Sequence, residues 1–259
     1  MTVSYRVDDR VAILTLDEAP RRNALSRAMI ASLNALLDRS MRDGARAIVI
    51  AATGPAFCAG ANIDDLRSGW MEGGAPETDP IHFFRRLVEE SRVTVAAVHG
   101  LAAGGGLELS LACDLIMVGE RGAFVAPELG HGVVPPLGAA LLARSVGRHR
   151  AAEMILTRRK VGAEEALRIG LASRAAGAGE VVEAAAALAR QIVASVPPGA
   201  LRVAKQQFAR HPPIDWDNVF SSSAKVPPAE WREGLDAFLE KRSPEYERFW
   251  ASGHDGESR

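Results

Sequence analysis

The chain has 259 residues, of which 24% are charged, and its 31 basic and 32 acidic residues give a net charge of -1. A chain of this length can bury a sizeable core, while the balanced charge provides no field that would attract nucleic acid or an anionic membrane. Two cysteines, no zinc-ligand spacing, no targeting pattern and no membrane-spanning apolar run lead us to expect a cytoplasmic protein without metal, membrane or nucleic-acid partners.

The first half of the chain reads as strands alternating with helices. Residues 11–16 are rich in β-forming side chains and end at a turn, which predicts a strand. Apolar residues then recur at helical spacing from Ser26, a suitable N-cap, to about Arg42. Short apolar runs predict four further buried strands, at residues 47–51, 94–98, 115–118 and 123–125. This order favours an α/β core with mostly parallel strands.

Beyond Gly138 the sequence becomes alanine-rich and helical. Helices are predicted over residues 139–146, 151–157, 163–169, 180–195, 199–210 and 229–239. We therefore predict an α/β core over residues 1–195 and a C-terminal helical region over residues 196–259. Residues 68–80 contain three glycines and two prolines, which predicts an irregular loop.

A run of three glycines, at residues 104–106, separates a predicted strand from Glu108. Glycines let a backbone N–H approach a ligand without a Cβ in the way, and the start of a helix favours an anion. The run is not a dinucleotide fingerprint, because Leu109 occupies the place of the last glycine. The P-loop lysine and a nucleophile-elbow serine are also missing. An oxyanion-binding turn and a ligand-free strand-to-helix turn both remain open.

A second glycine turn, Ala59-Gly60-Ala61, also follows a predicted buried strand. Two such turns after neighbouring parallel strands can each present one N–H group at the same edge of a sheet, where ligands bind in open α/β proteins. Two converging N–H groups are the usual arrangement for holding an oxyanion. Glu108 and Glu128 add two carboxyls, which can divide acid and base roles when proximity separates their pKa values.

Seven stretches in order resemble the crotonase superfamily, the enoyl-CoA hydratase and isomerase enzymes. They are PRRNALS, AFCAGANID, VAAVHGLAAGGGLELSLACDL, FVAPELG, VGRHRAAEMILT, AEEALRIGLA and EGLDAFLEKRSPEY. The resemblance implies a crotonase-like spiral of β-β-α units with a C-terminal α-helical region that trimerises. It also implies a homotrimer or a dimer of trimers, and a reaction without metal or redox cofactor, because CoA is part of the substrate.

The resemblance implies a role for each site residue. Ala61 and Gly105 match the two oxyanion N–H donors around a thioester carbonyl, and Glu108 and Glu128 match the acid/base pair. The implied activity is reversible addition of water to a 2-enoyl-CoA thioester. The residues implied to contact CoA or substrate are Arg22, Ala24, Ala59, Ala61, Asn62, Ile63, Asp64, Gly105, Phe238 and Lys241.

Phe238 and Lys241 match a segment that packs on the CoA of a neighbouring subunit in related trimers, and the alternative for them is an amphipathic packing helix. Trp70 either lines an acyl pocket or packs within its own segment. Among the scattered histidines, which form no cluster, only His131 lies near a predicted catalytic residue. The acyl group is not specified, because residues 68–86 and the tail build its pocket.

Two positions depart from the family pattern. Asn62 stands where an aspartate is usual, which removes a charge, and Pro136 stands where hydratases carry a glycine with a free N–H near the catalytic water. Proline has no N–H to donate. Hydration of cyclic dienoyl-CoA thioesters, enoyl-CoA isomerisation and non-catalytic acyl-CoA binding therefore remain alternatives.

Overall fold

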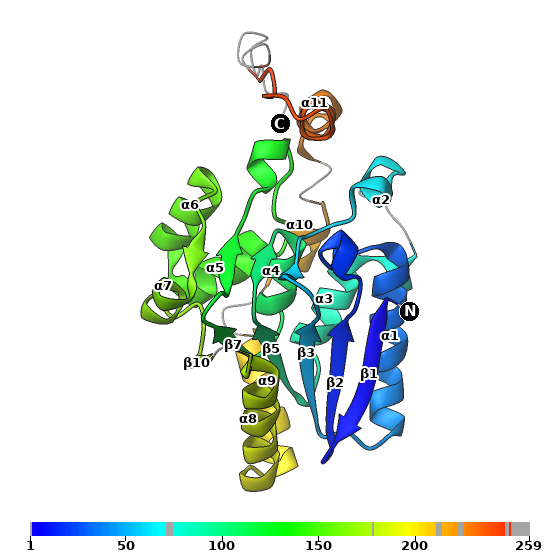
Figure 1. Ribbon diagram of the computed structural model, residues 1–259, viewed down its shortest axis with the longest axis vertical. Helices are drawn as coiled ribbons and strands as arrows, with labels where there is room; N and C mark the ends of the chain where they lie inside the picture. The colour runs from blue at the N-terminus through cyan, green and yellow to red at the C-terminus, as the bar shows by residue number, and fades with distance from the viewer. Residues whose placement is uncertain are drawn as a thin grey trace.

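The computed structural model describes residues 2–70, 75–177, 179–210, 214–221, 225–246 and 249. Its larger sheet has six strands, with five running parallel and β1 antiparallel to β2 (Figure 1). In spatial order these strands are β1 (Val3–Asp8), β2 (Val11–Leu16), β3 (Ala47–Ala52), β5 (Val93–Val98), β7 (Leu115–Gly119) and β10 (Arg174–Ala176). The predicted α/β core with mostly parallel strands is confirmed.

A second, smaller sheet decides where the site lies. It contains β4 (Ala56–Cys58), β6 (Leu101–Ala103), β8 (Ala123–Val125) and β9 (Val161–Gly162), of which the first three are parallel. Each of these three short strands directly follows a long strand of the larger sheet along the chain. Their carboxyl ends therefore meet at one edge, and each leads into a segment with a predicted site residue.

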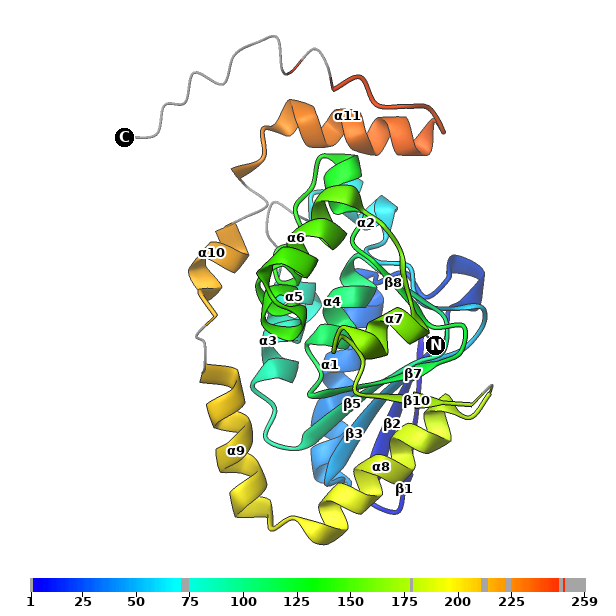
Figure 2. The same cartoon turned by 90° about the vertical axis from the view of Figure 1, so that its left-hand side faces the viewer.

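The central strands β2, β3 and β5 of the larger sheet are buried on both faces, to which their side chains point alternately. Leu14, Ile48 and Ala96 pack with α1 (Arg27–Arg42) and α4 (Gly105–Leu111). Ile13 and Val49 pack instead with α8 (Val181–Ser195), which covers the other face (Figure 2). Helix α1 begins as predicted, with the Ser26 hydroxyl accepting from the Met29 N–H at 3.2 Å.

The helices predicted beyond Gly138 are all present, each within three residues of the expected bounds. The remaining elements are η1 (Ala19–Arg21), α2 (Ile63–Arg67), η3 (Pro76–Thr78), α3 (Pro80–Val88), η4 (Glu128–His131), α5 (Gly138–Val146), α6 (Arg148–Thr157), α7 (Ala163–Arg168), α9 (Pro198–Arg210), α10 (Trp216–Ser221) and α11 (Pro228–Leu239). None of the helices in the described part of the chain is long and apolar enough to span a membrane. The domain boundary at residue 195 stays a prediction.

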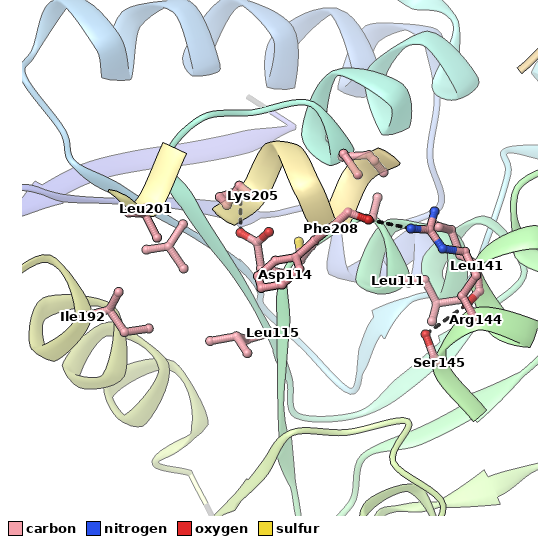
Figure 3. A pocket seen from close by; sticks show the side chains of 15 residues that line it. Leu111, Asp114, Leu115, Leu141, Arg144, Ser145, Ile192, Leu201, Lys205 and Phe208 are labelled. Atoms are coloured by element: carbon pink, nitrogen blue, oxygen red, sulfur yellow. Dashed lines mark hydrogen bonds and ion pairs between the residues drawn. The ribbon is translucent and has the colours of Figure 1, made fainter. Parts of the chain in front are cut away.

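Helices α9 and α11 lie at opposite ends of the molecule (Figures 1 and 2). Lys205 of α9 is only 5% exposed, and its ammonium group pairs with the Asp114 carboxylate, which fastens α9 to the core (Figure 3). The same ammonium donates to the Arg92 carbonyl. Helix α11 packs on η4.

The segment over residues 68–80, which was predicted to be an irregular loop, contains the helix η3 and a buried tryptophan. Trp70 is buried, and its indole N–H donates to the Thr78 carbonyl of η3 at 3.1 Å. The indole thus packs within its own segment, one of the two predicted alternatives. Residues 71–74 lie outside the described part of the chain.

Candidate active site

The first turn of the site joins β4 to α2 and is held beside the segment that follows η1. The Gly60 carbonyl accepts from the Leu25 N–H at 2.7 Å, and the Leu25 carbonyl accepts from the Asn62 N–H at 2.7 Å. Ala61 lies between these two bonded groups, in a parallel bridge with Leu25. Its own N–H makes no hydrogen bond within the described chain.

The second turn joins β6 to α4 and touches the first. Gly104 has a positive φ of 53°, which favours glycine, and Gly105 opens the helix. A Cβ on Gly105 would lie 3.7 Å from the Ala61 nitrogen, so the two turns are neighbours. The Gly105 N–H, like that of Ala61, donates to no described residue. Two undonated N–H groups side by side can hold an anionic oxygen.

Glu108 lies on α4, one turn after Gly105, and is only 6% exposed. Its Oε1 accepts from the N–H groups of Leu137 at 2.9 Å and Gly138 at 2.7 Å. Burial raises the pKa of Glu108 to about 7, while these two hydrogen bonds act in the opposite direction. The two donors favour the ionised carboxylate, which is the form that can act as a base.

Glu128 opens η4, directly after the third short strand, β8. Its Oε1 lies over Gly104, since a Cβ on that glycine would be 3.2 Å from it. Burial raises the pKa of Glu128 to about 8, and the negative charge of Glu108 adds to the shift. The buried Oε2 has no hydrogen-bond partner among the described residues. Burial without hydrogen-bond donors favours the protonated form of Glu128, which is the form that can act as an acid.

Three adjacent short strands thus bring together two undonated N–H groups, one carboxyl that accepts two backbone donors and one carboxyl with an unpartnered oxygen in the described chain. This set can stabilise a developing oxyanion, take a proton from one atom and give a proton to another. Among the described residues, no group of three or more His, Cys, Asp or Glu side chains could hold a metal ion.

Comparison with known proteins identifies the family. The profile of the enoyl-CoA hydratase/isomerase family matches residues 6–249. The chain belongs to this family. Its structure superposes on an enoyl-CoA hydratase/isomerase from Pseudoalteromonas atlantica with a TM-score of 0.84 and 31% identity, covering 94% of this chain and 99% of the other.

Two further members of the family are similar to this chain. Carnitinyl-CoA hydratase from Mycobacterium avium superposes with a TM-score of 0.81 and 29% identity, over 94% of this chain and 97% of the other. The 2,3-dehydroadipyl-CoA hydratase of Escherichia coli is 34% identical over 150 residues, which cover 57% of this chain and 58% of that protein. The chain spans less than two thirds of the length of the curated relatives it matches.

Most of the residues that the family resemblance assigns to CoA lie together around the first turn. The Ala59 N–H donates to the Arg22 carbonyl at 3.0 Å, which sets the segment of Arg22 and Ala24 beside the turn. Asn62 caps α2, with its side-chain oxygen accepting from Asp64 N–H at 2.9 Å. Ile63 and Asp64 form the first turn of that helix. The CoA contacts themselves stay predictions.

The two tail residues lie elsewhere. The ring of Phe238 packs against His131 of the same chain, with ring centroids 4.9 Å apart, so α11 covers the Glu128 turn. Lys241 is exposed beyond the end of α11, with a φ of 54°. The predicted contact of both residues with a neighbouring subunit stays a prediction. Burial lowers the pKa of His131, with nearby Arg158 adding to the shift, so this family member keeps a neutral imidazole there.

Three contributors to the site were absent from the sequence-based prediction. Leu137 and Gly138 act through backbone N–H groups, and the type of side chain does not predict which backbone groups will donate. Tyr246 donates from its hydroxyl to the Gly130 carbonyl at 2.9 Å. The local sequence carried no signal for this contact, because the two residues lie 116 positions apart.

Proposed function

We propose that this protein is an enoyl-CoA hydratase, which reversibly adds water to a 2-enoyl-CoA thioester. The observation that carries the proposal is the pair of carboxyls, one with two backbone donors and one with an unpartnered buried oxygen, beside the undonated N–H groups of Ala61 and Gly105. Similar proteins are named as enoyl-CoA or related acyl-CoA hydratases, which supports the substrate class. The reaction as proposed needs no cofactor beyond the CoA of the substrate.

In the proposed reaction, the thioester oxygen accepts from the N–H groups of Ala61 and Gly105. The Glu108 carboxylate removes a proton from water, and the water oxygen bonds to the β-carbon of the substrate. The electron pair of the double bond moves toward the thioester, forming an enolate held by the two N–H groups. Glu128 then gives its proton to the α-carbon. Loss of one such N–H donor typically costs about 2.7–4 kcal/mol of transition-state stabilisation.

Pro136 keeps a second candidate open, namely hydration of a cyclic dienoyl-CoA thioester. Residue 136 offers no N–H, and the next two N–H groups, of Leu137 and Gly138, are both engaged by Glu108. In this proposal only the two carboxyls therefore remain to position the water. The family resemblance implies that ordinary hydratases also have a free backbone N–H near the water at this position. Isomerisation fits less well, because it can proceed with one glutamate near the place of Glu128, and Glu108 is retained.

The proposal includes a cytoplasmic homotrimer or dimer of trimers, with the predicted CoA contacts at the first turn. Val203 and Phe208 of α9 are 53% and 68% exposed, which offers apolar surface for contacts between subunits. Sedimentation of the purified protein measures the assembly directly.

The test is substitution of each glutamate. We expect Glu108→Gln and Glu128→Gln each to lower hydration by about 10²–10⁴-fold, because each removes one proton-transfer group. Turnover is followed by the loss of absorbance of the conjugated enoyl thioester. Glu120→Gln is the control, since Glu120 is exposed in the turn between β7 and β8.

Wild-type turnover in both glutamine variants would contradict the acid/base assignment. A panel of acyl-CoA thioesters that varies chain length and ring content separates the candidate substrates. Absence of turnover across the whole panel would favour a non-catalytic acyl-CoA binder.

A further inference from the structure

We propose that the C-terminal segment over residues 228–246 positions the catalytic acid, with Tyr246 and α11 clamping the η4 turn that carries Glu128. The proposal rests on the proposed function, in which Glu128 donates the proton. It assigns Tyr246 the role of a positioning residue, because its hydroxyl acts on the backbone of the turn and not on the substrate.

The first observation is that α11 and the η4 turn touch backbone to backbone. Gly132 ends η4 with a φ of 69°, and a Cβ there would lie 2.6 Å from the Glu230 carbonyl oxygen of α11. From the other side, a Cβ on Gly234 of α11 would lie 2.2 Å from the His131 carbonyl oxygen. Contacts this short leave no room for any side chain. Both glycines are therefore required for α11 to rest directly on the turn.

The second observation is that Gly130 is held from two sides. The Tyr246 hydroxyl donates to its carbonyl at 2.9 Å. On the other side, a Cβ on Gly130 would lie 2.3 Å from Nη1 of Arg158, which follows α6. The middle of the η4 turn is thus fixed between the tyrosine hydroxyl and the arginine side chain.

The third observation is that the chain is folded back so that Tyr246 reaches the turn. Glu233 of α11 is only 7% exposed, and its carboxylate accepts from Arg242 Nη1 at 2.6 Å and from the Glu245 N–H at 2.8 Å. These bonds hold the segment after α11 against the helix. The charged groups facing the Tyr246 hydroxyl are Glu233 and Glu230 of α11 and Arg158.

Glu128 depends on this clamp because its own side chain has little else to hold it. No other described residue donates a hydrogen bond to the Glu128 carboxyl, in contrast to the two donors on Glu108. Its direction is therefore set by the backbone of η4, in which Gly130 N–H donates to the Pro127 carbonyl at 2.9 Å and Val133 N–H to the Glu128 carbonyl at 3.1 Å. A displaced Gly130 moves the carboxyl with it.

The chain offers a matched test, because it contains two tyrosines. Tyr246→Phe removes the clamp hydroxyl, and Tyr5→Phe removes a similar hydroxyl on β1, which donates to Asp43 at 2.8 Å. We expect Tyr246→Phe to lower kcat about three- to tenfold, the effect of one lost hydrogen bond, with KM unchanged. Tyr5→Phe should leave both constants unchanged.

Amide hydrogen exchange gives a second readout that does not depend on turnover. In Tyr246→Phe the amides of Gly130, Gly132 and Val133 should exchange faster than in the wild type, and in Tyr5→Phe they should not. The more disruptive Gly234→Ala should show the same faster exchange and a larger fall in kcat.

The outcomes separate this proposal from the proposed function. Wild-type kcat and wild-type exchange in Tyr246→Phe, together with an inactive Glu128→Gln, would overturn the clamp and leave the hydratase assignment standing. Full turnover in Glu128→Gln would overturn the acid assignment, while the exchange comparison would still decide whether Tyr246 holds the turn.

Discussion

Glu108 is buried and Glu128 is half-buried with one buried carboxyl oxygen, and the two side chains differ in the hydrogen bonds around them. Glu108 accepts two backbone N–H groups on one oxygen, whereas Glu128 has a buried oxygen without a partner in the described chain. Hydrogen bonds to a carboxylate favour its charged form, and burial without them favours the neutral form. The chemical division between base and acid thus follows from neighbouring backbone groups.

This arrangement predicts the pH dependence of hydration. The pKa values are raised by burial to about 7 for Glu108 and about 8 for Glu128. Activity should fall below about pH 7, where Glu108 takes up a proton, and above about pH 8, where Glu128 loses its own. We therefore expect a bell-shaped profile of kcat/KM with its maximum between these values, the two limbs belonging to the interacting pair.

The control is the pH profile of the residual activity of Glu128→Gln. Because the glutamine side chain has no proton to lose, the alkaline limb of the profile should disappear. An alkaline limb of unchanged position in that variant would contradict the assignment of the acid.

At the scale of elements, the contact between β4 and α4 keeps the two N–H donors together. A Cβ on Gly106 would lie 2.3 Å from the Cys58 carbonyl oxygen, so glycine lets the helix rest on the end of the strand. We expect Gly106→Ala to destabilise the protein by about 1–3 kcal/mol through overpacking. Its hydration rate should fall as well, because α4 moves Gly105 away from Ala61.

Urea unfolding and turnover measure both effects. Gly199→Ala in α9 is the matched control, since an added Cβ there meets nothing within 4 Å and alanine is the better helix former. Equal stability and equal turnover in the two alanine variants would contradict the role of the close contact.

The elements differ in how well the sequence predicts them. Strands such as β3 and β5 are continuous apolar runs and were predicted, as were the alanine-rich helices beyond Gly138. Strands β4 and β6 have three residues each, too few for periodicity to show, and were missed, although β8 of the same length was predicted from its apolar run. The helix α3, which begins at Pro80, was also missed.

The residues of the candidate site also differ in how well the sequence predicts them. Side chains and glycines within motifs, such as Glu108 and Gly105, could be predicted because local sequence carries the pattern. The donors from Leu137 and Gly138 lie 29 and 30 residues from Glu108, and Tyr246 lies 116 residues from Gly130. Only tertiary packing creates such contacts, so no local sequence pattern predicts them.

For the whole molecule, the Lys205–Asp114 ion pair decides how firmly α9 is attached. Both groups lie beside the cavity drawn in Figure 3, and Lys205 is 5% exposed. Removing one partner of a buried pair leaves an uncompensated charge. We expect Lys205→Met to lower the free energy of unfolding by about 3–5 kcal/mol.

Urea denaturation checks this value against a matched exposed pair. Glu89→Gln breaks the bond from Arg85 to Glu89, whose side chains are 44% and 50% exposed, and should cost less than about 1 kcal/mol. Equal losses in the two variants would mean that α9 is held by apolar packing and not by the ion pair.

The contact between Tyr246 and Gly130 also fixes when the site can be completed during synthesis. The tyrosine is added 116 residues after the glycine. At about 5–20 residues per second, translation separates them by on the order of ten seconds. A nascent chain therefore holds both glutamates, and the strands that carry them, well before the segment that covers the acid turn exists. Full catalytic activity therefore requires that residues 228–246 have been synthesised and packed onto the turn.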